Sequence, residues 1–169
     1  MDVTDYTLGE NNTLISFDSR LDNREIATSL IRQAKYRIRI LTPDLENPVY
    51  DNLELNQSLS RLASLHKHSS INILVSDSTA AVKQGHRIIE LARQFNSSIH
   101  LHQTPQDRQE MNFAMLIADD SGYLYKHHGD SYQGQACFYD KSKVRELAKT
   151  FDDAWERSQS DPELRRLFI

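Results

Sequence analysis

Histidine is the residue type with the most chemical potential in this sequence, and six of its seven copies lie close to another copy. His66 and His68 flank a lysine, His100 and His102 flank a leucine, and His127 and His128 are adjacent. A zinc site needs three or four ligands with recognisable spacing, and no His-Glu-x-x-His or comparable pattern occurs. We therefore interpret these histidines as loop or strand-edge residues, and we expect no metal or other cofactor.

Gly85, His86 and Arg87 stand at the start of a predicted helix. Free N–H groups and the helix dipole can bind an anion at such a position, and the two basic side chains would add positive charge. The three residues are a candidate anion-binding site. The alternative is a glycine near a helix start that is followed by two exposed polar side chains.

A basic patch, Arg32, Lys35, Arg37 and Arg39, surrounds a predicted helix–strand junction. Arg37 and Arg39 lie two residues apart on a strand and so share one of its faces. Tyr36 is the single aromatic residue within the patch, fewer than a stacking platform for single-stranded nucleic acid would require. The patch indicates either anion or nucleic-acid binding or a solvated face.

Length and composition indicate one domain without a membrane span. The chain has 169 residues, a net charge of −4 and a single cysteine, Cys137, which excludes an internal disulfide and is interpreted as a small buried residue. The net charge argues against bulk nucleic-acid binding. The first residues do not resemble a signal peptide, and no apolar run approaches the ~20 residues of a spanning helix. We expect one cytoplasmic domain over residues 1–169 with its core in 13–157.

The elements that must position these residues alternate between strand and helix along most of the chain. Asp22 is a predicted N-cap because Glu25 follows at the capping-box spacing. Strands are predicted at 13–17, 37–41, 71–75, 99–101, 113–118, 122–125 and 136–139, and helices at 22–34, after Pro48, at 83–95, 142–157 and 162–168. This order predicts an α/β fold with a mixed sheet: parallel crossover units come first, an antiparallel hairpin follows, and helices cover both faces.

The element order and several segments resemble one half-domain of the phospholipase D-like superfamily. "EIATSLIRQAKYRIRILTPDL" resembles its opening helix and strand, "INILVSDS" and "GHRIIELARQFNSSIHL" the parallel units that follow, and "NFAMLIADDSGYLY" the hairpin that carries its His-x-Lys-x4-Asp signature. "FDDAWERS" resembles its closing helix. The chain is also similar to an uncharacterised bacterial domain sometimes found behind acetyltransferase domains.

The signature itself is absent from this chain. If Asp119 takes the place of the family aspartate, Asn112 and Ala114 occupy the histidine and lysine positions, and no histidine is followed by a lysine two residues later. In the family the histidine is the nucleophile and the lysine binds phosphate oxygens. An amide and a methyl group supply neither role.

The resemblance implies a vestigial cleft near the hairpin, with six candidate residues: Glu110, Asn112, Asp119, His127, His128 and Gln135. It also implies a homodimer, because the family builds one site from two half-domains. We predict a catalytically inactive domain that binds an unidentified ligand or partner or has a regulatory role. One alternative is an enzyme of another type that uses Asp119, His127 or His128 as acid and base. Another is anion or nucleic-acid binding through the basic patch.

Overall fold

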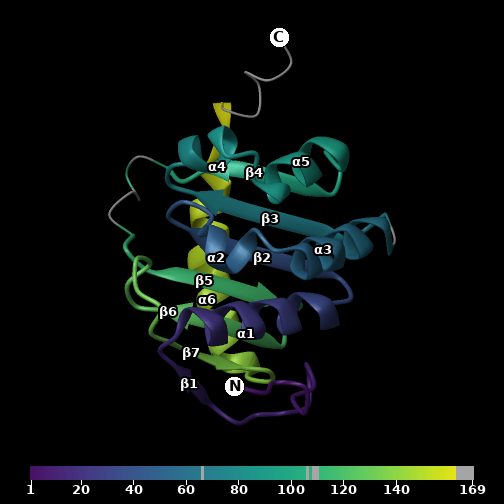
Figure 1. Ribbon diagram of the computed structural model, residues 1–169, viewed down its shortest axis with the longest axis vertical. Coiled ribbons are helices and arrows are strands. Elements are labelled where there is room, and N and C mark those ends of the chain that lie inside the picture. The colour runs from purple at the N-terminus through teal and green to yellow at the C-terminus, as the bar shows by residue number, and fades with distance from the viewer. Residues whose placement is uncertain (66, 106, 108–110, 163–169) are drawn as a thin grey trace.

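A mixed β-sheet with the strand order β1-β7-β6-β5-β2-β3-β4-β8 forms the centre of the protein (Figure 1). The computed structural model describes residues 1–65, 67–105, 107 and 111–162. The strands are β1 (Ile15–Phe17), β2 (Arg37–Thr42), β3 (Ser70–Val75), β4 (Ile99–Gln103), β5 (Ala114–Ala118), β6 (Gly122–Lys126), β7 (Gly134–Cys137) and β8 (Gln159–Ser160). The helices are α1 (Arg20–Gln33), α2 (Asn47–Tyr50), α3 (Leu53–Leu65), α4 (Thr79–Lys83), α5 (Arg87–Gln94) and α6 (Lys141–Glu156).

The strand directions define two edges of the sheet. Strands β2, β3 and β4 are parallel, and β5 lies antiparallel beside β2, with Leu41 opposite Met115 and Ile38 opposite Ala118. The carboxyl ends of the parallel strands therefore lie at the same edge as the start of β5 and the end of β6, which we call the carboxyl edge. The β5–β6 turn lies at the opposite, amino edge.

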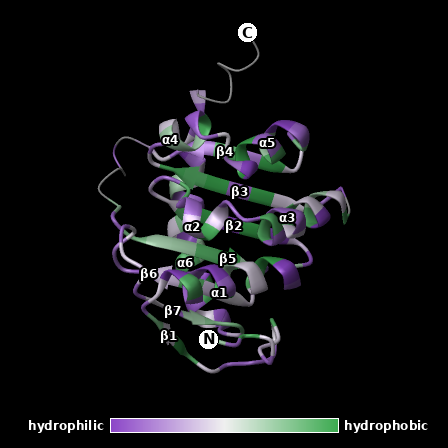
Figure 2. Cartoon of the chain, in the orientation of Figure 1, coloured by the Kyte–Doolittle hydropathy of each residue, from purple (hydrophilic) through white to green (hydrophobic). Residues whose placement is uncertain are grey.

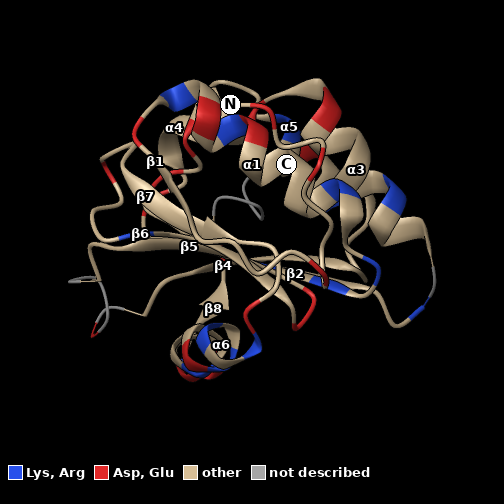
Figure 3. Cartoon of the chain, turned by 90° about the horizontal axis from the view of Figure 1, so that it is seen from below, with Lys and Arg blue, Asp and Glu red and all other residues tan. Residues whose placement is uncertain are grey.

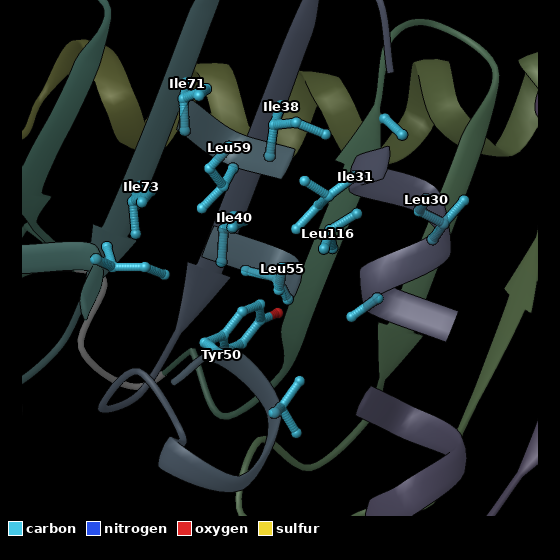
Figure 4. Close-up of a cluster of buried hydrophobic side chains, with 14 of the residues drawn as sticks. Leu30, Ile31, Ile38, Ile40, Tyr50, Leu55, Leu59, Ile71, Ile73 and Leu116 are labelled. Carbon is cyan, nitrogen blue, oxygen red and sulfur yellow. The ribbon is translucent and has the colours of Figure 1, made fainter. Parts of the chain in front are cut away.

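Helices cover the two faces of the sheet unequally. Helices α1 and α3–α5 lie over one face, and α6 crosses the other (Figure 3). Ile38 and Ile40 of β2 belong to the apolar layer under α1, α3 and α5, whereas Leu41 belongs to the layer under α6. The alternation follows from the two-residue period of a strand. Figures 2 and 4 show the apolar strands and the larger of these layers.

The structure confirms the predicted class, a mixed α/β sheet with helices on both faces, and corrects several bounds. Helix α1 starts earlier than expected, because Ser19 and not Asp22 is the N-cap: its side chain accepts from the Asp22 N–H. The predicted helix 83–95 is divided at Gly85, whose φ of +67° only glycine adopts readily. The last predicted strand lies two residues earlier, at Gly134–Cys137, and β8 was not predicted.

Three further predictions concern the ends, the cysteine and the membrane. The predicted helix 162–168 lies outside the described residues apart from Pro162. Cys137 is buried and free, as expected. None of the described helices is long and apolar enough to cross a membrane.

Candidate functional site

A buried ion pair stands at the carboxyl edge. Lys126, the last residue of β6, places its Nζ 2.6 Å from Glu46 Oε1, and the two side chains are only 2% and 12% exposed. The same Nζ donates to the carbonyl oxygen of Gly129 at 3.3 Å and lies 5.9 Å from the centre of the Tyr132 ring. The Lys126 ammonium therefore donates its hydrogen bonds to groups of its own chain.

Two tight backbone segments bring these charges together. After β2, the buried Leu45 adopts a positive φ of 61°, and its N–H donates to Thr42 Oγ1, which turns the chain so that Glu46 enters the site. After β6, Gly129 packs so closely that a Cβ there would lie 2.6 Å from Pro43 Cγ. Only glycine fits this approach, and it brings the β6–β7 loop against the β2–α2 loop.

The pKa of Glu46 is raised from its ordinary value. Burial is the largest cause, the Lys126 ammonium opposes it, and the nearby Asp44 carboxylate raises the pKa further. Lys126 thus compensates a carboxylate that the edge would otherwise destabilise in its charged form.

Two open pockets flank this pair, and both carry carboxylates. The first edge pocket, about 360 Å³, lies between the loops after β2, β3 and β6, and its polar lining residues are Asp44, Glu46, Asn47, Gln84, Asp130 and Tyr132. The second edge pocket, about 590 Å³, is lined by polar residues of the β1–α1 and β6–β7 segments: Ser16, Asp18, Asp22, His127, His128, Ser131, Gln133 and Gln135.

The candidate cleft residues do not all lie at this edge. His127, His128 and Gln135 line the second edge pocket with exposed side chains. Asn112 is exposed too, and its carbonyl accepts from the Gly129 N–H. Glu110 lies outside the described residues.

Asp119 lies at the amino edge, away from the other candidates. It has a φ of 52° in the β5–β6 turn, and its carboxylate accepts from the backbone N–H groups of Lys35, Tyr36 and Arg37. It therefore fixes the α1–β2 connection. The expectation that Asp119 shares a cleft with Asn112 and His127 is corrected: an extended strand separates the two ends of the hairpin, so Asp119 cannot act as acid or base together with either histidine.

The candidate anion site at Gly85, His86 and Arg87 is occupied by the chain itself. His86 is fully buried and caps α5: its Nδ1 accepts from the Ile88 N–H, and its Nε2 contacts the Leu45 carbonyl oxygen at 3.0 Å. The Asp51 carboxylate accepts from the Arg87 backbone N–H and pairs with its guanidinium, both at 3.1 Å. A carboxylate of the same chain thus stands where the sequence predicted an external anion.

His102 and the basic patch also make contacts within the chain. His102 stacks on Trp155 of α6 with ring centres 4.0 Å apart, so it serves packing. Arg32 of α1 pairs with Glu54, whereas Arg37 and Arg39 face α6. Within the described part of the chain, no group of three or more His, Cys, Asp or Glu side chains could hold a metal ion.

Lys126 and Glu46 were missed by the sequence interpretation, although one signal was present. Leu124 faces the larger apolar layer, and Lys126 follows two residues later on the same strand. The two-residue period therefore places a lysine at an inward position, which is costly without a partner.

A family model for a domain of unknown function, DUF7931, matches residues 19–167. The chain belongs to the DUF7931 family. This confirms the resemblance to an uncharacterised domain. The comparison with curated proteins found no match.

Solved structures show which fold the DUF7931 domain has. Nuc of Salmonella typhimurium, a phospholipase D family member, matches with a TM-score of 0.59 and 14% identity over 88% of this chain and 97% of its own. NucT of Helicobacter pylori matches with a TM-score of 0.60 and 14% identity over 89% of this chain and 98% of its own. TrmBL2, an archaeal chromatin protein, matches with a TM-score of 0.65 and 13% identity over 94% of this chain. This chain spans only 57% of TrmBL2. The fold is therefore phospholipase D-like.

Proposed function

We propose that this DUF7931 domain is a non-hydrolytic, phospholipase D-like binding domain. The observation that carries the proposal is the Lys126–Glu46 pair at the carboxyl edge. Ala114 occupies the lysine position of the family signature, and Lys126 is its direct partner on the neighbouring strand. The cation at this edge is thus on β6 instead of β5, and an internal carboxylate neutralises it.

The charge of the two edge pockets supports a ligand other than a phosphodiester. Lys126 neutralises Glu46, but the first edge pocket also contains the carboxylates of Asp44 and Asp130. The second contains Asp18 and Asp22, of which Asp22 pairs with the amino terminus. Carboxylates repel an anionic phosphodiester, and Asn112 offers no nucleophile. The edge is better suited to a partner with amine or guanidinium groups.

Hydrolysis of bis(4-nitrophenyl) phosphate tests the absence of phosphodiesterase activity. We expect the wild-type domain to release no nitrophenolate above the buffer rate, and Asn112→Asp and Asn112→Ala to behave identically. Turnover by wild type that Asn112→Ala or His127→Gln abolishes, while Lys67→Gln in the exposed α3–β3 connection at the amino edge retains it, would refute the proposal. Asp119→Ala is unsuitable as a test variant because Asp119 holds the α1–β2 connection.

Self-association is the second part of the proposal. Its support is the resemblance to a family in which two half-domains form one site. Sedimentation velocity at several protein concentrations should detect a dimer, and a monomer at every concentration would remove this part while leaving the binding role intact.

A further inference from the structure

A basic groove runs along α6 on the face of the sheet opposite α1, near the amino edge. Its volume is about 500 Å³, within the range of small-ligand sites. Five basic and two acidic side chains line it: Arg37, Arg39, Lys141, Arg145, Lys149, Asp120 and Asp152. We call this feature the α6 groove; the basic and acidic segments of α6 are visible in Figure 3.

Arg39 is a buried basic residue of the groove. Its side chain is 4% exposed, and its Nε lies 3.3 Å from Asp152 Oδ1. Its Nη1 is buried and has no hydrogen-bond partner among the described residues. Burial is the main reason why its pKa is lowered, and the neighbouring Arg37 lowers the pKa further. A buried guanidinium with an unused donor and a like-charged neighbour needs more negative charge than Asp152 provides.

The charges of α6 are arranged against its own dipole. Lys141, Lys143 and Arg145 occupy the first two turns and Lys149 lies near the middle, whereas Asp152, Asp153 and Glu156 occupy the carboxyl-terminal turns. Basic side chains are unfavourable near the positive end of a helix, and neighbours of like charge four residues apart repel each other. A sequence that violates local preferences in this way is expected at functional sites.

Three of the basic side chains are available to a ligand. Asp120 pairs with Arg37 at 3.1 Å and Asp152 with Arg39. Lys141, Arg145 and Lys149 are exposed and have no acidic partner among the described residues. A solvated helix face alone would explain these three, but it would not explain the buried, under-partnered Arg39 beneath them.

From these contacts we infer that the α6 groove binds a ligand with at least two neighbouring phosphate groups. Residues four apart on a helix are separated by about 6 Å along its axis, and Arg37 and Arg39 by about 7 Å along β2. Both walls therefore carry more than one cation within reach of a ligand that has several phosphates. Arginine forks match phosphate oxygens, and the amino-terminal half of the helix dipole adds to the positive potential. The phosphates of a nucleotide and those of a nucleic-acid strand share this chemistry.

Binding of tripolyphosphate and of a fluorescein-labelled 12-nucleotide single strand tests the groove and separates the two sources. We expect at least one probe to bind at 50 mM salt, and Arg145→Gln/Lys149→Gln to raise its Kd by about 10-fold or more, because each charge-assisted hydrogen bond contributes about that factor. The matched control, Arg24→Gln/Lys83→Gln, removes the same charge elsewhere and should change the Kd less than about 2-fold. Tripolyphosphate binding that the oligonucleotide cannot displace indicates a small ligand; binding of the oligonucleotide alone indicates a strand.

Arg39→Gln keeps a polar side chain at the buried position and should weaken binding of the same probe while thermal unfolding remains cooperative. Binding of neither probe at low salt, or equal loss in both double variants, would overturn the inference. The phosphate-binding assay reports on the α6 groove and the phosphodiesterase assay on the carboxyl edge, so the groove and the non-hydrolytic role are tested independently.

Discussion

Lys126 at the carboxyl edge and Arg39 in the α6 groove are both buried basic side chains on the same sheet, and they differ in their partners. Lys126 has a carboxylate at 2.6 Å, a carbonyl oxygen and an aromatic ring around it. Arg39 has one carboxylate at 3.3 Å that is itself half exposed, and one donor that has no partner among the described residues. The first site is electrostatically complete, whereas the second lacks negative charge.

The carboxyl edge and the α6 groove therefore have different electrostatic properties, and only the groove offers positive charge to a ligand. The edge pockets around Lys126 add carboxylates, and the α6 groove adds lysines and an arginine. A domain with a net charge of −4 can therefore still present a strongly basic surface. We expect phosphate groups to bind in the α6 groove and not at the carboxyl edge.

Breaking the Lys126–Glu46 pair should have the largest effect. Glu46→Gln leaves a 2% exposed ammonium without its counter-ion, and we expect the free energy of unfolding to fall by about 3–5 kcal/mol. Denaturation in urea measures the change. The exposed pair Lys143–Glu146 provides the control, because Glu146→Gln should cost less than about 1 kcal/mol.

Replacing both partners completes this test. Lys126→Met/Glu46→Leu removes two buried charges together and should recover most of the loss, because well-packed apolar residues often substitute for a buried pair without cost. A double variant as unstable as Glu46→Gln alone would show that the two side chains do not act as a pair.

Asp119→Ala should have the next largest effect and should act on the amino edge alone. The change removes the acceptor of three backbone N–H groups and places alanine at a positive φ, so we expect a loss of about 2 kcal/mol. Asp119→Asn should cost less, because an amide oxygen can still accept and asparagine tolerates this φ. The neighbouring Asp120→Ala is the control, and an equal loss there would contradict the assigned role of Asp119.

Acidification tests a third buried charge centre, the α5 start beside the carboxyl edge. Burial lowers the pKa of His86 below 6.5, so the unfolded chain binds its proton more readily than the folded chain does. The stability is thus fully present above pH 6.5 and is lost as the pH falls below that value. His102 acts in the same direction, because burial lowers its pKa as well.

Urea midpoints between pH 7.5 and 5.0 measure this dependence. His86→Gln should reduce the loss on acidification without abolishing it, since His102 remains. An unchanged pH dependence in that variant would mean that burial and the Ile88 N–H do not hold His86 neutral in the folded chain.

Local patterns were sufficient for the fold but insufficient for the site. The alternation of Arg37, Ile38, Arg39 and Ile40 already specified a strand, and helical spacing specified α6. The partner of Lys126 is 80 residues away in a loop, and no local pattern encodes such a pairing.

The position of Asp119 was predictable in principle: seven residues of extended chain span about 20 Å, so Asn112 and Asp119 could not share one edge. The prediction of an external anion at Gly85–Arg87 was wrong because Asp51 of the same chain supplies the negative charge at that helix start.

Reversing one charge at the start of α6 should give the smallest effect and distinguish the two regions most sharply. Lys141→Glu places a carboxylate at the first position of the helix, next to the Asp140 cap, and four residues before Arg145. Because the new charge suits both the dipole and Arg145, we expect the free energy of unfolding to rise by about 0.3–1 kcal/mol at low salt. The same substitution should weaken phosphate binding in the α6 groove.

If Lys141 serves a ligand and not the fold, Lys141→Glu should raise the free energy of unfolding and weaken phosphate binding in the α6 groove. Lys141→Gln should give about half the gain, since it removes the unfavourable charge without adding a favourable one, and 0.5 M salt should screen both gains. A fall in stability for Lys141→Glu would mean that the basic start of α6 serves the fold itself. The groove would then resemble the carboxyl edge, with its charge already satisfied from within.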